Sequence, residues 1–566
     1  MSSLVVPGVR VEARFDVLPP LPAPAGILGV VGIVDRPPAD GGLVTVSKAT
    51  EVRDLLGPGT ETSMPQLIHA LANGVSEAVV SAVAGGAPAS ARLLNADSAA
   101  VVLLRCRSNG AFGNALRAEV RSIADAAGTP VRVGLRLLRN GAVVESFDDL
   151  IVSPGAPDDL FETVNGRSRY VIALDPGFAD AAPRPGAYAF SDTVNVIAVP
   201  ENRDTNPRDL FQIRPADGVT PVGLRVEIAA EAAGRTGVRV FQGGLQESFS
   251  GLTTDPDRSD YLPYALLTQS RFVRVVALSS FAAPARLPAP TTTLVEFENG
   301  TSPTVEQYNE AVDRLADDTR VDLVLAAIEP QRTANEARQI HMALAAHAVA
   351  MADRGAPRIA FGSVTPLEQS DIGAIRDHAA TVRNRRFVLV SPTGAEGCVA
   401  GVVGRMNPQD SATFKSVPLF SIAAARYRES ELNRLLGPAI NLLVVQDRAG
   451  RGVVALKGID TTGDQVSVTR VADQCIRETK AISENFIGQL NSEEARIALK
   501  QQLVATFTRL ERAGALVPST DGKDPAFLVD VYSTQTDFAQ GIVRIDIAVR
   551  PVRAIDYIYA TIRVKN

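Results

Sequence analysis

The first hydrophobic pattern of the chain lies close to its N-terminus. Apolar and charged side chains alternate strictly between residues 7 and 17, and the apolar positions are Val9, Val11, Ala13, Phe15 and Val17. This alternation is typical of a β-strand that buries one face. Residues 18–26 (LPPLPAPAG) follow, and their prolines lack the N–H donors that a sheet needs. The pattern predicts a strand held away from the rest of the chain by a stiff, extended tether.

Apolar strands alternate with amphipathic helices in two separate stretches of the chain. In the first, a helix at 63–74 lies between strands at 27–34 and 77–83. In the second, the pattern predicts strands at 321–328, 357–364 and 386–391 and helices at 305–318, 333–355 and 367–382. Thr333 and Glu336 have the spacing of a capping box. This alternation predicts one mostly parallel sheet with helices on both faces, interrupted by a large insertion.

The insertion contains an internal repeat. Residues 145–160 match residues 247–262 at a constant offset of 102, and "SRYV" (168–171) matches "SRFV" (270–273) at the same offset. The paired residues are Glu145 and Glu247, Phe147 and Phe249, Leu150 and Leu252, Pro154 and Pro256, Asp158 and Asp260, and Leu160 and Leu262. Because two copies are too few for a solenoid, the repeat predicts two tandem β-rich domains.

The end of the chain resembles its beginning. An amphipathic helix at 492–514 has an apolar stripe and ends at a glycine. Alternating strands follow at 541–550 and 557–564, and Pro551 interrupts them. The inward positions of the last strand are Ile558, Ala560, Ile562 and Val564. The pattern therefore predicts a detached strand at this end too.

These patterns predict an α/β core, a mixed sheet with helices on both faces, that carries two tandem inserted β-rich domains and extended N- and C-terminal β-strand arms. The predicted segments are an N-terminal arm and linker (1–25), the first core segment (26–93), the two inserted copies (94–195 and 196–294), the second core segment (295–540), and the C-terminal strands and arm (541–566).

Composition narrows the class of protein. The chain has 566 residues, of which 46% are hydrophobic and 21% charged, as in globular proteins. A net charge of -6 gives no support to nucleic-acid binding. Three widely spaced cysteines indicate a reducing compartment, and no apolar run approaches the roughly 20 residues that span a bilayer. We expect assembly in the cytoplasm and no membrane insertion.

No motif for chemistry emerges from the sequence. The four histidines have no HExxH or i, i+4 spacing, so we interpret them as core or helix-face residues. Cys398 has no base nearby in the sequence and is interpreted as a small buried residue. The glycines of "GILGVVG" (26–32) lie inside a strand rather than after it, which favours close packing over nucleotide binding. We therefore expect no catalytic residue, no cofactor and no metal.

Detached strands at both ends, without a catalytic motif, favour assembly by strand exchange. A strand added to a neighbour's sheet gains backbone hydrogen bonds and buries one apolar face. The alternative is that both end strands fold back onto their own core, and periodicity alone leaves that alternative open.

Motifs along most of the chain resemble those of tail sheath proteins from contractile injection systems: contractile phage tails, R-type bacteriocins and extracellular injection particles. "PGVRVEARF" (7–15) resembles the opening strand of the family, and residues 26–57 resemble its first core segment. "SNGAFGNALRAEV" (108–120) resembles the start of the inserted domain, with Phe112 in place of the usual Trp. Residues 391–422, 432–444, 458–480 and 526–564 resemble C-terminal segments, although "LKG" (456–458) replaces the usual Trp-Gly.

The resemblance implies a structural protein. Its subunits would polymerise, as stacked six-fold rings, into a helical sleeve around an inner tube, and would contract to drive that tube through a target cell envelope. Implied partners are other copies of the chain, the inner tube protein, and baseplate and tail-terminator proteins, in a virion tail or a released injection particle. The flexible links would be residues 18–26 and 551–556. The alternatives are a static self-assembling shell or tubular protein and, less favoured, an α/β enzyme.

Overall fold

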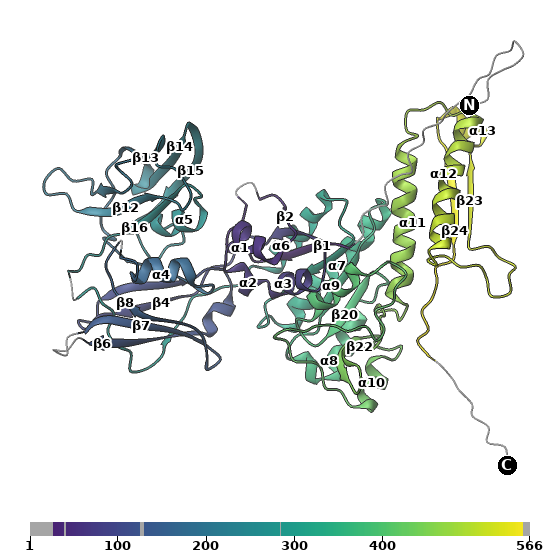
Figure 1. Cartoon of the computed structure of the whole chain (residues 1–566), viewed down its shortest axis with the longest axis horizontal. Helices are drawn as coiled ribbons and strands as arrows, with labels where there is room; N and C mark the ends of the chain where they lie inside the picture. The colour runs from purple at the N-terminus through teal and green to yellow at the C-terminus, as the bar shows by residue number, and fades with distance from the viewer. Residues whose placement is uncertain (1–25, 39–40, 125–129, 155, 283–284, 558–566) are drawn as a thin grey trace, which may run out of the picture.

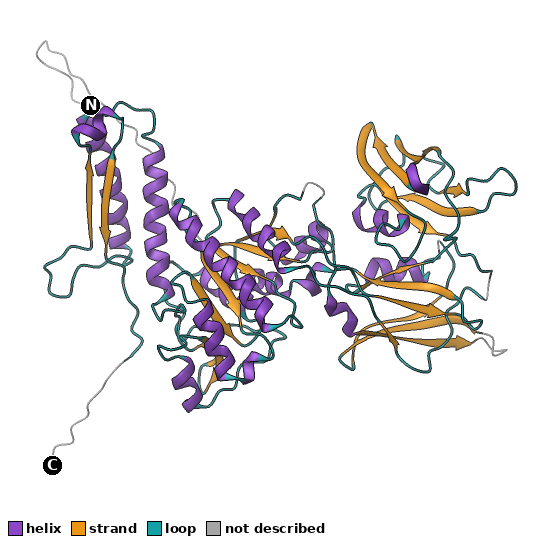
Figure 2. Ribbon diagram, turned by 180° about the vertical axis from the view of Figure 1, so that it is seen from behind, coloured by secondary structure: helices purple, strands orange, loops and turns teal. Residues whose placement is uncertain are grey.

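The computed structural model describes residues 26–38, 41–124, 130–154, 156–282 and 285–557. Figure 1 shows an elongated molecule with three parts in a row: a group of β-sheets at one end, an α/β core in the middle, and two long helices with a β-hairpin at the other end. The same arrangement is seen from behind in Figure 2, where strands dominate only one end of the molecule.

The core is built on an eight-stranded sheet. Its inner strands are parallel, and an antiparallel strand closes each edge. In spatial order the strands are β2 (Val44–Val46), β3 (Glu77–Ala82), β1 (Ile27–Gly32), β18 (Leu323–Ala326), β19 (Ile359–Ser363), β20 (Phe387–Ser391), β21 (Leu443–Arg448) and β22 (Gly452–Ala455). Strands β1, β18, β19 and β20 are buried along their whole length, as expected of strands covered on both faces.

Helices cover both faces of this sheet. Leu28 and Val30 of β1 point to one face, and Ile27 and Val31 point to the other. The first face packs against α1 (Ala49–Leu56), α3 (Pro65–Ala72) and α9 (Glu396–Arg405), with the short α2 (Thr60–Ser63) between α1 and α3. The second face packs against α6 (Val305–Arg314), α7 (Ala334–Asp353), α8 (Ile372–Thr381) and α10 (Glu429–Leu435). The expected capping box of Thr333 and Glu336 begins α7.

Between β3 and β18 the chain forms four smaller antiparallel sheets. The first copy of the repeat contains β4 (Ser90–Leu94), β5 (Ala100–Cys106) and β9 (Val171–Leu174) in one sheet, and β17 (Val295–Glu296), β6 (Leu116–Ala124), β7 (Pro130–Arg139) and β8 (Ala142–Leu150) in the other. The second contains β11 (Ile197–Pro200), β12 (Asp209–Pro215) and β16 (Val273–Ala277), and β10 (Gly186–Ala189), β13 (Leu224–Ala230), β14 (Thr236–Gln242) and β15 (Gly244–Leu252).

The structure repeats at the offset seen in the sequence. Strands β8 and β15 are 102 residues apart at both ends, and so are helices α4 (Leu160–Arg167) and α5 (Leu262–Gln269). The repeat extends to side chains: Ser168 Oγ donates to Glu145 in the first copy, and Ser270 Oγ donates to Glu247 in the second. Each copy has its own apolar cluster, so each buries its own core.

Strand pairing crosses the segment boundaries expected from sequence. Strand β4 lies at the 93/94 boundary and pairs with β5 of the first copy. Strand β10 lies before residue 196 but pairs with β13 of the second copy. Strand β17 follows residue 294 but pairs with β6 of the first copy. Short edge strands therefore pair across the expected boundaries, and β17 does so with a copy that is not its neighbour in sequence.

The C-terminal part consists of α11 (Val466–Glu484), α12 (Glu493–Arg512) and a hairpin of β23 (Phe527–Tyr532) and β24 (Arg544–Val549), with the short α13 (Gln535–Ala539) in the hairpin loop. Short 3₁₀ turns are η1 (Ala111–Ala115), η2 (Ala232–Gly234), η3 (Leu315–Asp317) and η4 (Glu368–Ser370).

Candidate assembly interface

The side chains expected to form the inter-subunit arms lie outside the described residues. They are Val9, Val11, Ala13, Phe15 and Val17 at one end, and Ile558, Ala560, Ile562 and Val564 at the other. Their pairing therefore stays a prediction. The structure does describe a sheet with open edges near the C-terminus and the two points at which the chain leaves the core toward these segments.

The sheet with open edges is the hairpin of β23 and β24, whose inner face lies on α12. Strands β23 and β24 pair antiparallel from Phe527–Val549 to Tyr532–Arg544. The apolar stripe expected on the helix is present, and its buried members are Leu499, Leu503, Phe507 and Leu510. The Phe507 and Phe527 ring centroids lie 5.6 Å apart. Alternating hairpin side chains face this stripe and are partly buried, including the expected Val543, Ile545, Ile547 and Val549.

Both outer edges of this hairpin are open. Within the described part of the chain, β23 pairs only with β24 and β24 only with β23. Each strand therefore presents a row of backbone N–H and C=O groups on its outer side, where another strand can pair. A two-stranded sheet is only marginally stable in water unless it packs against other elements. The hairpin is thus suited to accept further strands on either side while α12 supports its face.

The chain enters the core at Gly26. The Gly26 N–H donates to Asp322 Oδ2 at 2.9 Å, and the Asp322 N–H donates to the Ile27 carbonyl at 3.1 Å. Gly26 has a φ of +85°, and a Cβ there would lie 2.1 Å from the Gly404 carbonyl oxygen. Only glycine fits this position, because a side chain would face both backbone strain and a collision with backbone. The entry point is therefore rigidly defined.

The chain leaves the core at residues 553–556. Gln465 holds Ala554 with two hydrogen bonds of 2.9 Å, one to its carbonyl and one from its N–H. Arg553 pairs with Asp464 at 2.7 Å, and Asp556 accepts from Gln465 at 2.8 Å. The flexible link expected over 551–556 is therefore bonded to the start of α11, because Asp464 and Gln465 supply partners that hydrophobic periodicity does not reveal.

Charged side chains fasten α11 across the amino ends of the core strands. Arg386, which precedes β20, makes two hydrogen bonds of 2.8 Å with Asp473 of α11. Burial raises the pKa of Asp473, and the Arg386 guanidinium opposes that effect. Arg477 of α11 donates to the carbonyls of Val321 and Pro357, which precede β18 and β19. The C-terminal part is thus attached to the core by hydrogen bonds to three neighbouring strands.

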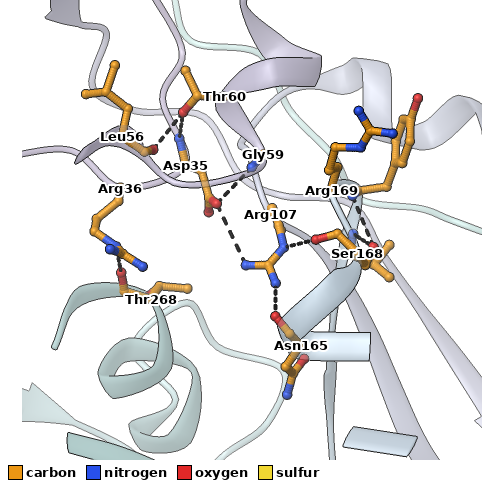
Figure 3. Close-up of polar contacts among 12 residues, drawn as sticks. Asp35, Arg36, Leu56, Gly59, Thr60, Arg107, Asn165, Ser168, Arg169 and Thr268 are labelled. Carbon is orange, nitrogen blue, oxygen red and sulfur yellow. Dashed lines mark hydrogen bonds and ion pairs between the residues drawn. The ribbon is translucent and has the colours of Figure 1, made fainter. Parts of the chain in front are cut away.

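A second polar junction joins the core to the inserted copies (Figure 3). Asp35, which follows β1, lies 3.8 Å from Arg107 of the first copy, and both side chains are buried. Burial raises the pKa of Asp35, and the Arg107 charge opposes that effect. Arg107 also donates to the Ser168 carbonyl at 2.8 Å, while Arg36 donates to the Thr268 carbonyl of the second copy at 3.2 Å. The core therefore contacts both copies through two successive residues.

The histidines, Cys398 and the glycines of β1, which were considered for chemistry, are all buried or closely packed. All four histidines are buried on helices, and the fully buried Cys398 has its thiol pKa raised to about 12 by burial. Gly29 and Gly32 lie in β1 against Val321 and Met64, where a Cβ would come within about 3 Å of either side chain. Among the described residues, no group of three or more His, Cys, Asp and Glu is placed to hold a metal ion.

No helix in the described part of the chain has both the length and the apolar character that crossing a bilayer requires.

Comparison with known protein families gives a match in the C-terminal part of the chain. Residues 460–565 match the family model described as the phage tail sheath C-terminal domain. No curated protein sequence matches the chain. The sheath tail protein of Desulfitobacterium hafniense has a similar structure, with a TM-score of 0.47 and 13% identity over 97% of each chain. The sheath tail protein of Listeria innocua gives a TM-score of 0.44 and 12% identity over 95% of this chain and 94% of its own.

The contracted helical sheath of the anti-feeding prophage is also similar, with a TM-score of 0.35 and 17% identity over 45% of this chain and 74% of its own. Because these TM-scores lie below 0.5, the family assignment rests on the domain match. That match covers α11, α12, both hairpin strands and the segment at which the chain leaves the core. The motifs had indicated this family, and residues 460–565 match the model of its C-terminal domain.

Proposed function

We propose that this chain is the structural subunit of a contractile sheath. It polymerises as a helical sleeve around an inner tube and shortens to drive that tube through a target cell envelope. The observation that carries the proposal is the sheath-domain match over residues 460–565, the segment that presents a hairpin with two open edges. A sleeve must join many copies of one subunit, and open strand edges provide a repeated way to join them.

The proposed contacts are made by the two arms. Residues 7–17 of one subunit and 557–564 of another pair with the outer edges of β23 and β24 in a third. Each added strand gains backbone hydrogen bonds and turns its apolar side chains toward α12. Full burial of Phe15 alone contributes about 1.5–3 kcal/mol. Because Gly26 and Ala554 are hydrogen-bonded to the core, each arm starts from a fixed point, which favours a regular lattice.

The inserted copies have a peripheral role in this proposal. Residues 88–300, in place of the 94–294 expected from the sequence, form two β-rich domains on the outside of the sleeve, and the core together with the C-terminal helices and hairpin builds the sleeve. The supporting observations are the separate apolar clusters of the two copies and their position at the end of the molecule opposite to the hairpin (Figure 1). Baseplate and tail-terminator proteins bind the two ends of the sleeve, which assembles in the cytoplasm and works in a virion tail or a released injection particle.

The test is assembly of the full-length protein and of a Val11→Pro variant, observed by electron microscopy. Wild-type protein should form tubes or stacked rings without any cofactor. Proline removes one backbone donor from the arm without shortening it, so Val11→Pro should abolish tubes while circular dichroism and the melting temperature stay unchanged. Ala23→Pro is the matched control, because it adds a proline to a segment that is already proline-rich.

Three results would contradict the proposal. Wild-type protein that stays monomeric at high concentration and at all salt concentrations would exclude a sheath. Normal tubes from Val11→Pro would exclude strand exchange by the N-terminal arm. Failure of Val11→Pro to fold as a monomer would place the strand in its own core. If the axial rise per subunit is the same in tubes formed with and without an inner tube, the result would instead support a static tubular protein.

A further inference from the structure

A cavity of about 180 Å³ opens at the carboxyl ends of the parallel core strands. Its walls include Ile328 after β18, Thr365 after β19 and Thr393 after β20, and helices α3 and α9 close it from one side. Next to it, the order of the sheet reverses, because β1 pairs with β3 on one side and with β18 on the other. Open α/β sheets bind ligands outside the carboxyl ends of their strands, near such a reversal.

Buried polar atoms without partners gather in this cavity. Glu396 of α9 is 3% exposed, and its Oε1 accepts from Gln66 Nε2 of α3 at 3.1 Å. Glu396 Oε2, Gln66 Oε1 and His69 Nδ1 have no hydrogen-bond partner among the described residues, although all three side chains are more than nine-tenths buried. Both carboxylate oxygens of the buried Glu329, which also lines the cavity, have no hydrogen-bond partner among the described residues either. An unpaired buried polar group costs about 1–3 kcal/mol, so five such atoms around one cavity require an explanation.

The charges around the cavity indicate what kind of group would satisfy these atoms. The described residues that line it include Glu396 and Glu329 but no lysine or arginine. Glu329 Oε2 lies 3.4 Å from Arg332 Nε, whereas the groups that hydrogen-bond Glu396, Gln66 and Ser363, are neutral. Burial raises the pKa of Glu396, and hydrogen bonds from Ser363 and Gln66 oppose that rise. Burial lowers the pKa of His69. The cavity thus combines acceptor atoms with an uncompensated carboxyl group.

We propose that this cavity binds a primary ammonium or guanidinium group, whose N–H donors pair with Glu396 Oε2 and Gln66 Oε1. Such a group supplies the missing donors and compensates the carboxylate. A metal ion is a poorer match, since no group of three or more His, Cys, Asp and Glu among the described residues is placed to hold one. The volume suits a small diamine or the end of one lysine or arginine side chain, and is below the roughly 300 Å³ at which drug-sized pockets begin.

Two sources can provide this chemistry: a free small amine, or a basic side chain of a second copy of this chain. The rim admits either source, because Pro330, Pro366 and Ser421 are exposed around the opening. The cavity lies on the core, away from the hairpin at the end of the molecule, so its occupant is distinct from the arm strands.

The test is calorimetric titration of agmatine, which carries both an ammonium and a guanidinium group, into the unassembled full-length protein at low salt. We expect a dissociation constant of about 0.1–1 mM, which is reasonable for so small a ligand. Glu396→Gln should weaken binding at least tenfold. The matched control is Asp447→Asn, which removes an exposed carboxylate from a different and more open groove and should leave binding unchanged.

A second variant covers the case in which Glu396→Gln fails to fold. Ser421 is exposed at the rim, so Ser421→Trp should block the opening without disturbing the core, and agmatine binding should be lost. If assembled tubes bind agmatine as unassembled subunits do, the natural ligand is a free amine. If only unassembled subunits bind it, a neighbouring copy fills the cavity on assembly.

Absence of agmatine binding to unassembled wild-type protein would overturn the proposal. Equal binding by wild type, Glu396→Gln and Ser421→Trp would overturn it as well, because the ligand would then bind elsewhere. The measurement on unassembled subunits does not depend on the proposed sheath function, so failure of one leaves the other intact.

Discussion

At the scale of single residues, the core contains a chain of buried polar side chains between α7 and α8. His341 Nδ1 lies 2.9 Å from His378 Nε2, and His378 Nδ1 lies 2.9 Å from Glu368 Oε2. Arg338 donates to the other carboxylate oxygen at 2.7 Å. Burial acts to raise the pKa of Glu368, but the hydrogen bond and charge of His378, together with Thr365 and Arg338, lower it to about 2. The carboxylate is therefore held in its charged form.

This network predicts a pH-dependent contribution to stability. The ordinary pKa of Glu368 is 4.5, so its contribution is complete above that pH and is lost as the pH falls toward 2. The shift corresponds to roughly 3 kcal/mol. Glu368→Gln should lower the free energy of unfolding by about that amount at pH 7, and the difference from wild type should shrink between pH 4.5 and 2. Denaturant unfolding at several pH values measures it.

The control for that measurement is Glu310→Gln on the exposed surface of α6, which should change stability by less than about 0.5 kcal/mol at any pH. A difference for Glu368→Gln that stays constant from pH 7 to pH 2 would show that the carboxylate contributes through packing rather than charge.

Sequence patterns did not reveal such polar groupings. Glu396 and Gln66 are 330 positions apart, and they meet only because α9 and α3 pack side by side on one face of the sheet. Asp464 and Gln465, which hold the C-terminal link, carry no periodic signal. Side-chain partners of this kind depend on the tertiary fold, whereas a sequence pattern reports on burial along one element.

At the scale of elements, local periodicity predicted most of the core correctly. The α12 stripe and the alternation in β24 were both visible because each element buries one face. The patterns did not reveal which strands pair at the edges of the expected segments. The short strands β4, β10 and β17 join sheets across the expected boundaries, and pairing of this kind depends on residues far away in the sequence. Hydrophobic patterns carry no information about which distant strand supplies the partner.

The repeated elements predict equal energetic roles for two serines. Ser168 and Ser270 are fully buried, and each donates to a glutamate and accepts from two backbone N–H groups that follow it. Replacing either by Ala leaves those donors unpaired, at a cost of about 1–3 kcal/mol in its own copy. Hydrogen exchange should show lost protection at residues 169–174 for Ser168→Ala and at 271–277 for Ser270→Ala.

Matched controls come from the repeat itself. Ser146 and Ser248 are equivalent positions on β8 and β15, and both are exposed, so Ser146→Ala and Ser248→Ala should leave exchange unchanged. A loss of protection that spreads from one copy into the other would show that the two copies unfold together.

At the scale of the whole molecule, the insertion joins the core through two chain segments that meet in an antiparallel bridge between Ala87 and Thr301. The Ala87 N–H donates to the Thr301 carbonyl at 2.9 Å, and the Thr301 N–H donates back to Ala87 at 3.0 Å. Residues bonded in this way have Cα atoms about 5.5 Å apart, so a two-residue Asn-Gly turn can connect them.

Deleting residues 88–300 and inserting Asn-Gly should therefore leave a folded core that still forms tubes of smaller diameter. The deletion also removes Arg107, but Asp35 then becomes accessible to water and needs no partner. Circular dichroism and electron microscopy measure the outcome. An insoluble or unfolded product would mean that the core needs the inserted copies for its stability. Joining residues 94 and 295 directly is the contrasting variant, which should fold less well because it leaves β4 without its partner β5.

The bonds that hold residues 553–556 to the start of α11 have a mechanical consequence. From Asp556 to Ile558 the chain can span only roughly 7 Å, so the proposed C-terminal strand would begin close to the core of its own subunit. From Val17 to Gly26 it can span roughly 30 Å, through a segment stiffened by proline. In the proposed sleeve, neighbouring subunits can therefore turn about the short C-terminal connection. The longer N-terminal connection limits how far apart they can move.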